Sequence, residues 1–113
     1  MLRIWHNPRC SKSRQTLTLL EENGHTPDVF LYLETPPDAA MLETVLGKLG
    51  LSAGEAARTG QDEWKAAGLS KASAEEDVRA AMLATPILIE RPIVETDDKA
   101  AIGRPPETVL DIL

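Results

Sequence analysis

The sequence has few of the cysteine, histidine and aromatic residues on which many functions depend: 113 positions hold one Cys, two His, two Trp, one Tyr and one Phe. One cysteine cannot form a disulfide within the chain, so a redox cycle at its thiol requires an outside partner. Because the lone Cys10 and two widely separated histidines, His6 and His25, lack the spacing of metal ligands, we expect no metal. The few scattered aromatic residues predict no base-stacking surface for nucleic acid.

Long apolar runs and glycine-rich loops are missing too. No apolar run approaches the roughly 20 residues of a membrane span, and no secretory signal begins the chain, so we expect a cytoplasmic protein. A net charge of −6 repels nucleic-acid backbones and anionic membranes, and we expect neither as a partner. No glycine pattern fits a phosphate-binding loop, and no bound cofactor is expected.

The beginning of the chain predicts a βαβ unit. Residues 2–5 form a short apolar run that ends at a turn, and residues 11–22 lack Gly and Pro and end at the helix-capping pair Asn23-Gly24. Residues 29–33 are β-branched and aromatic and lie between turn residues, as in a buried strand. This order of elements favours a right-handed crossover between parallel strands.

The middle of the chain, residues 36–84, is predicted to be mostly helical. Its helix-start signals are Thr35 before Pro36, and two capping boxes, Ser52 with Glu55 and Ser73 with Glu76. A hairpin of residues 93–95 and 100–102 and a short helix from Pro105 follow. The chain, residues 1–113, therefore predicts a single α/β domain: a thioredoxin-like mixed sheet with a helical insertion between its halves.

Cys10 lies at the predicted turn from the first strand into the first helix. A helix N-terminus carries partial positive charge and unpaired amides, which favour a thiolate and can hold an anion. The nearby side chains that could add positive charge are His6, Arg9, Lys12 and Arg14. Because only the thiolate is strongly nucleophilic, this position favours a reactive cysteine over an inert buried one.

The residue three positions after Cys10 is Ser13, where a dithiol oxidoreductase carries a second cysteine. An adduct on Cys10 must therefore be resolved by an external thiol. Away from this loop, three arginines lie at predicted element edges: Arg58, Arg91 and Arg104. Guanidinium groups can hold an oxyanion bidentately beside a thiolate, although each arginine taken alone is typical of a solvated surface.

Three separated motifs resemble one known family: "WHNPRCSKSR", "YLETPP" and "PILIERPIVE…GRPPETVLDIL". They are similar to the arsenate reductases of thioredoxin fold that are coupled to glutathione and glutaredoxin. The resemblance implies that Cys10 is the nucleophile and that His6 lowers its pKa. It implies that Arg58, Arg91 and Arg104 bind arsenate, with Pro92 as the family's cis-proline. We expect Ser13 and Arg14, which follow Cys10 in the first helix, to belong to the same substrate site.

The resemblance also implies an order of steps and of partners. The Cys10 thiolate attacks arsenate, glutathione attacks the adduct as co-substrate, and glutaredoxin regenerates the enzyme while arsenite leaves. The chain departs from the family pattern after the cysteine, where Ser11-Lys12 replaces the typical Gly-Thr.

Two other functions fit parts of the same pattern. A glutathione-dependent thiol-disulfide transferase would need Cys10 and Pro92 but not the three arginines. An adaptor similar to the Spx-type regulators, which bind RNA polymerase, generally carries a Cys-x-x-Cys switch, and Ser13 removes it here.

Overall fold

A computed structural model describes residues 1–113, which divide into two compact units. The first unit combines both ends of the chain, Met1–Thr35 and Arg91–Leu113, and the second is the intervening segment Pro36–Glu90. The prediction that the chain is a single domain stays a prediction. None of the helices combines the length and the apolar character that a membrane span requires.

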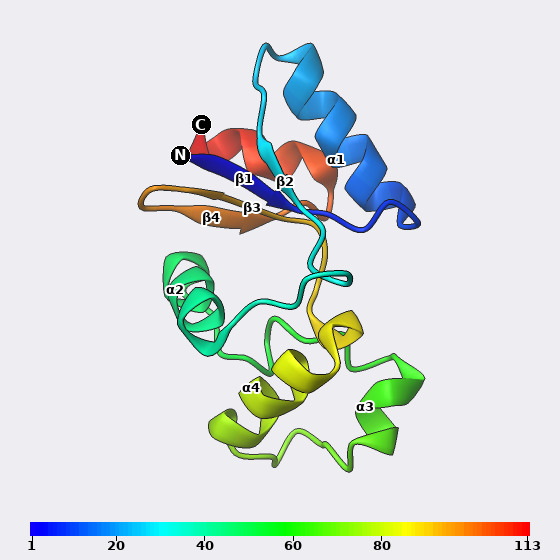
Figure 1. Ribbon diagram of the computed structural model, residues 1–113. Helices are drawn as coiled ribbons and strands as arrows, with labels where there is room; N and C mark the ends of the chain where they lie inside the picture. The colour runs from blue at the N-terminus through cyan, green and yellow to red at the C-terminus, as the bar shows by residue number, and fades with distance from the viewer. The chain divides into compact units, whose positions relative to one another are not determined.

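The first unit contains a four-stranded sheet in the order β2-β1-β3-β4 (Figure 1). Its elements are β1 (Leu2–Trp5), α1 (Ser11–Glu22), β2 (Asp28–Phe30), β3 (Ile93–Thr96), β4 (Ala100–Ile102) and the 3₁₀ helix η2 (Pro106–Ile112). β1 pairs in parallel with β2 and antiparallel with β3, and β3 pairs antiparallel with β4. The βαβ unit, the hairpin and the C-terminal helix predicted from the sequence are confirmed.

The second strand is shorter than the predicted run 29–33. It ends at Phe30, which pairs with Trp5, the last residue of β1. Beyond this pair the chain turns, and the amides of Glu34 and Thr35 both donate to the carbonyl oxygen of Leu31 at 3.0 Å. The strand prediction is wrong at its end because no partner strand continues beside it.

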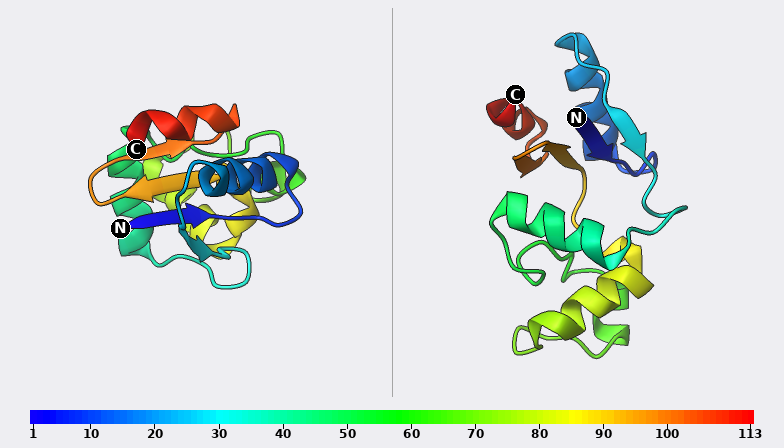
Figure 2. Two further views of the ribbon diagram at one scale, coloured as in Figure 1. Left: turned by 90° about the horizontal axis from the view of Figure 1, so that it is seen from above. Right: turned by 60° about the vertical axis from the view of Figure 1, so that its left-hand side comes forward.

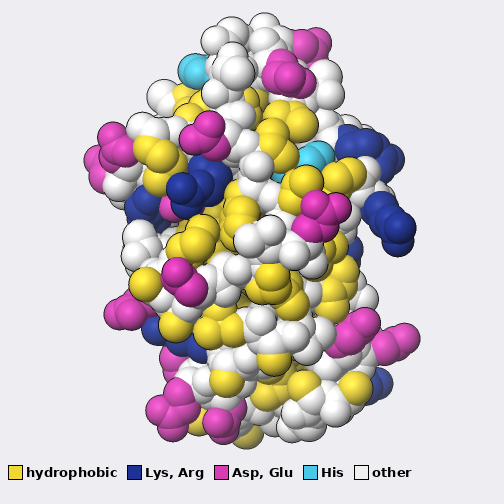
Figure 3. Space-filling model, in the orientation of Figure 1, with side chains coloured by type: hydrophobic (Ala, Val, Ile, Leu, Met, Phe, Trp, Pro, Cys, Tyr) yellow, Lys and Arg dark blue, Asp and Glu magenta, His cyan; other side chains and the backbone are white.

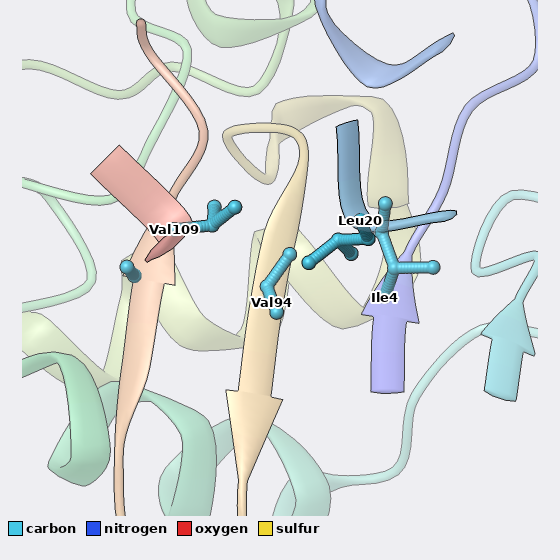
Figure 4. Packing of buried hydrophobic residues seen from close by; sticks show 5 residues of the cluster. Ile4, Leu20, Val94 and Val109 are labelled. Carbon is cyan, nitrogen blue, oxygen red and sulfur yellow. The ribbon is translucent and has the colours of Figure 1, made fainter. Parts of the chain in front are cut away.

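The core of the first unit lies on the sheet face that α1 and η2 cover (Figure 2). Ile4 and Val94 project from neighbouring strands toward Leu20 of α1 and Val109 of η2, and all four side chains are fully buried (Figure 4). The cluster holds α1 against the sheet, and so holds the first turn of α1 beside the loop that follows β1.

The ends of α1 are those predicted. Cys10 is the N-cap, with φ −92° and ψ 122°, and Asn23 is the C-cap. Gly24 follows with φ +81°, a left-handed conformation that glycine adopts without steric cost. Local signals therefore place the cysteine at the helix start.

The second unit contains α2 (Ala39–Leu49), α3 (Asp62–Ala66), α4 (Glu75–Ala84) and the 3₁₀ helix η1 (Pro86–Leu88). The prediction of Thr35 as a cap before a helix at Pro36 is wrong. The N-cap of α2 is Asp38, whose carboxylate accepts from the Met41 amide at 2.8 Å. Asp38 captures an amide that would otherwise be unpaired, so the helix begins after it.

The two predicted capping boxes have different outcomes. The Ser52 amide donates to Glu55 Oε1 and the Glu55 amide to Ser52 Oγ, at 2.9 and 3.2 Å, but turns follow instead of a helix. The second box is wrong, because α4 begins after Ala74 and the hydroxyl of Ser73 accepts from the amide of Ser70 at 2.9 Å. Because the turn before α4 uses the Ser73 hydroxyl, this side chain does not cap the helix.

Candidate active site

The thiol of Cys10 is partly buried at the N-terminus of α1. The loop before it is held by its own hydrogen bonds, since the Cys10 amide donates to the Asn7 carbonyl oxygen and the Arg9 amide to Asn7 Oδ1, both at 3.0 Å. The Arg14 amide donates to the Cys10 carbonyl oxygen at 3.0 Å, the first bond of the helix. The sulfur therefore lies where the helix amides are unpaired.

The pKa of the Cys10 thiol is lowered from its ordinary value. Burial acts in the opposite direction and raises the pKa. Hydrogen bonds from the Ser13 amide, the Arg91 side chain and the Lys12 amide outweigh burial, and the positive charge of Arg91 adds to them. The helix start and one arginine thus favour the nucleophilic thiolate, as expected from the sequence.

A second arginine contacts the same sulfur. Arg104 Nη2 lies 3.6 Å from Cys10 Sγ, and Arg104 Nε donates to the carbonyl oxygen of Arg91 at 2.8 Å. The Arg91-Pro92 peptide bond is cis, as predicted, and the Arg104-Pro105 bond is also cis, which the sequence analysis did not predict. The structure therefore brings Arg91 and Arg104 together at Cys10.

Gly103 is a residue that the sequence analysis missed. Its amide donates to the Pro92 carbonyl oxygen at 2.9 Å. A Cβ atom at this position would lie 2.6 Å from Thr16 Oγ1 and 2.8 Å from Pro92 Cγ, closer than real contacts allow. Only glycine lets the chain before Arg104 approach α1 so closely; the Gly-Arg-Pro-Pro motif was the available signal.

His6 and Ser13 form a buried pair below the cysteine loop. His6 Nδ1 lies 2.6 Å from Ser13 Oγ, which also accepts from the Asn7 amide at 3.0 Å. Because Ser13 Oγ accepts from the Asn7 amide through one lone pair, the proton of the Ser13 hydroxyl can be donated to Nδ1 of a neutral His6. Ser13 was predicted to contact substrate. Its side chain is fully buried and bonds to His6 and the Asn7 amide within the loop, while its backbone amide donates to the Cys10 thiol.

The pKa of His6 is lowered from its ordinary 6.5, first because of burial and second because of the charge of Arg14. The groups that lower the pKa of Cys10 are Ser13, Lys12 and Arg91, and His6 is not among them. His6 reaches the thiol region through the hydroxyl of Ser13. A direct effect of His6 on the thiol stays a prediction.

Arg14 and Arg58 have partners of their own. Arg14 Nη1 donates to the carbonyl oxygen of Pro8 at 2.8 Å, so this side chain spans the cysteine loop. Arg58 belongs to the second unit, where Nη1 lies 2.9 Å from Glu90 Oε1 and the backbone amide donates to the Leu88 carbonyl oxygen at 2.7 Å. Substrate contacts for both arginines stay predictions.

The charge of this region contrasts with the net charge of the chain. Lys and Arg side chains gather over the end of α1 that begins at Ser11, on the right in Figure 3. No group of three or more His, Cys, Asp and Glu side chains forms a possible metal site. The described site thus consists of a thiol with a lowered pKa, helix amides and guanidinium groups, a combination that can bind an oxyanion and attack it.

A βαβ-ββ sheet that holds a lone cysteine at the start of the first helix defines a thioredoxin-like protein with a single-thiol site. The sequence model of the ArsC family matches residues 5–112, and the chain belongs to the ArsC family. The predicted fold class and family are confirmed.

Proteins similar to this chain include the uncharacterized protein YfgD of Escherichia coli, 54% identical over 99% of this chain and 96% of that protein. An arsenate reductase of Neisseria meningitidis serogroup A is 46% identical, over 99% of this chain and 97% of the relative. Among solved structures, an arsenate reductase from Vibrio cholerae superposes with a TM-score of 0.95 at 44% identity, over 99% of this chain and 97% of that one.

Proposed function

We propose that this chain is an arsenate reductase that uses glutathione as its co-substrate and glutaredoxin as its regenerating partner. The observation that carries the proposal is the environment of Cys10, whose sulfur contacts Arg104 and accepts a hydrogen bond from Arg91. Membership of the ArsC family and the similarity to arsenate reductases of Neisseria meningitidis and Vibrio cholerae support arsenate as the substrate.

The site suits a tetrahedral oxyanion for electrostatic reasons. A thiolate and an oxyanion repel each other, so their approach requires fixed positive charge and hydrogen-bond donors. Arg91 and Arg104 supply both at the sulfur, and the amides of Lys12 and Ser13 add donors from the start of α1. The family resemblance implies the same role for Arg58.

In the first step of the proposed cycle, the Cys10 sulfur forms a bond to arsenic(V), and one arsenic oxygen leaves as water. The glutathione thiolate then attacks, a disulfide forms between Cys10 and glutathione, and arsenic leaves as arsenite. Arsenate, one Cys10 thiol and one glutathione thus yield arsenite, one mixed disulfide and one water; arsenic gains the two electrons that the two sulfurs lose.

Glutaredoxin completes the cycle. Its thiolate attacks the glutathione sulfur of the mixed disulfide, takes the glutathionyl group and releases the Cys10 thiol. Because Cys10 is the one cysteine in the sequence, the chain has no second thiol for this step. The external reductant is therefore a chemical requirement of a single-cysteine cycle.

The test is arsenate-dependent oxidation of glutathione, measured with and without glutaredoxin. We expect turnover that requires arsenate and rises with glutaredoxin, and we expect Cys10→Ser to abolish it. Turnover that persists in Cys10→Ser would refute the scheme. Release of glutathione from a glutathionylated peptide, with no response to arsenate, would identify a thiol-disulfide transferase instead.

A further inference from the structure

A small cavity lies next to the cysteine loop. It has a volume of about 310 Å³ and is lined by Asn7, Pro8, Arg9, Leu33 and Glu34. One wall is the loop after β1 and the other is the turn after β2. These are the carboxyl ends of two parallel strands, the edge at which α/β sheets commonly bind ligands.

We propose that this cavity binds the external thiol in the form of a small peptide thiol that carries both carboxylate and ammonium groups. Glutathione is the probe of this class. The inference rests on the proposed function, because it locates the co-substrate of the same reaction.

The position of the cavity suits a resolving thiol. Asn7 lines it, and the carbonyl oxygen of Asn7 accepts a hydrogen bond from the Cys10 amide at 3.0 Å, so the cavity lies beside the backbone of the nucleophile. The two walls are joined by the His6 amide, which donates to the Phe30 carbonyl oxygen at 2.9 Å. The loop and the turn therefore keep one geometry, and the cavity is preformed.

The lining matches a zwitterionic peptide in charge and polarity. Arg9 offers a cation for a carboxylate and Glu34 an anion for an ammonium group, and neither side chain forms an ion pair within the protein. Pro8 and the 39% exposed Leu33 supply apolar surface between them. A mainly apolar lining with a few convergent polar groups is typical of small-molecule sites, whose volumes begin at about 300 Å³.

A larger groove, of about 480 Å³, lies between α1 and η2 and is the competing location. Its charged residues are Arg14, Glu22 and Glu107, so its net charge is negative. Arg14 already donates to the Pro8 carbonyl oxygen. A peptide thiol with two carboxylates is repelled by this groove, and the cavity at Arg9 and Glu34 is favoured.

Binding is tested directly with S-methylglutathione, which cannot react, added to the ¹⁵N-labelled protein. We expect saturable shifts of the Asn7, Arg9, Leu33 and Glu34 amides in NMR spectra. Glu34→Gln should weaken binding about fivefold, since it removes one exposed charge pair, whereas Glu22→Gln in the α1–η2 groove should not change it. No saturable shifts, shifts confined to the groove, or unchanged binding by Glu34→Gln would overturn the inference.

A second experiment separates this inference from arsenate reduction. Cys10 is converted to its mixed disulfide with 5-thio-2-nitrobenzoate, and release of the dye by glutathione is compared with release by 2-mercaptoethanol. We expect a saturable rate with glutathione only, and a higher half-saturation concentration in Glu34→Gln. Saturation without arsenate-dependent turnover would refute the proposed function alone, whereas linear dependence on glutathione would refute the cavity alone.

Discussion

Arg104 contacts Cys10 across 94 positions of sequence, with its Nη2 3.6 Å from the sulfur. The same guanidinium donates through Nε to the Arg91 carbonyl oxygen at 2.8 Å. It is therefore held by the backbone that precedes β3 while it faces the thiol that precedes α1. One side chain links the two segments that form the site, so its replacement should affect both anion binding and the thiol.

We expect replacement of the predicted anion-binding arginines by alanine to lower kcat/KM for arsenate about tenfold or more in each case, because donors that stabilise developing charge are lost. The variants are Arg58→Ala, Arg91→Ala and Arg104→Ala. The matched control is Arg79→Ala, which removes an exposed arginine of α4 that pairs with Glu75. Equal effects of control and test variants would show that general loss of charge, and not the site, sets the rate.

The thiol of Cys10 should titrate below the free cysteine value of about 8.5. The measurement is the rate of alkylation by iodoacetamide as a function of pH, and Arg91→Ala should move its midpoint upward. Because the folded pKa is lowered, the thiolate adds stability that is fully present above the unfolded pKa and is lost as pH falls through the folded pKa. Cys10→Ser should lack this pH-dependent stability; a midpoint at or above that of free cysteine would contradict the proposed catalysis.

Ser13→Ala should lower the free energy of unfolding by about 1–3 kcal/mol, because it leaves a buried amide at Asn7 without its acceptor. Urea denaturation measures the loss. The matched control is Ser11→Ala, at an exposed position two residues earlier in α1, which should change stability by less than about 0.5 kcal/mol. If both variants unfold at the same urea concentration, the hydroxyl does not brace the loop.

Gly103→Ala should destabilise the protein by about 1–3 kcal/mol and reduce turnover, because the new methyl group overlaps Thr16 and Pro92. The control is Gly47→Ala within α2, where a Cβ meets no atom within 4 Å. That change should stabilise by roughly 0.5–1 kcal/mol, since alanine favours a helix interior. Thermal unfolding followed by circular dichroism distinguishes the two; equal stability of Gly103→Ala and the parent would refute the close approach.

Local sequence signals were sufficient where neighbouring residues decide the structure. Asn23-Gly24 ended α1 as expected, and the start of that helix followed from the turn that precedes Cys10. Where two local solutions competed, the prediction was wrong: Asp38 replaced Thr35 as the cap of α2, and the turn at Ser70 used the hydroxyl of Ser73. A capping pattern shows that a side chain can reach an amide, but the turns beside it decide which amide it reaches.

The residues of the candidate site likewise differ in how far local sequence signals identify them. Cys10 could be recognised from its place at a helix N-terminus, and the arginines only as cations beside prolines. Their meeting at the sulfur depends on β1 and β3 pairing side by side, which brings the residue before Pro92 to the end of β1. The family resemblance supplied the correspondence that residue patterns alone did not.

The amino-acid sequence by itself determined that a single thiol lies at the start of a helix, and that any redox cycle at this thiol would need an outside partner. The first follows from residues adjacent in the chain, and the second from the number of cysteines. The tertiary structure alone decided that Arg104 and Arg91 contact Cys10, that the hydroxyl of Ser13 faces inward, and that Gly103 lies against α1. These contacts join segments far apart in sequence, and their geometry is set by strand pairing and core packing that no local pattern specifies.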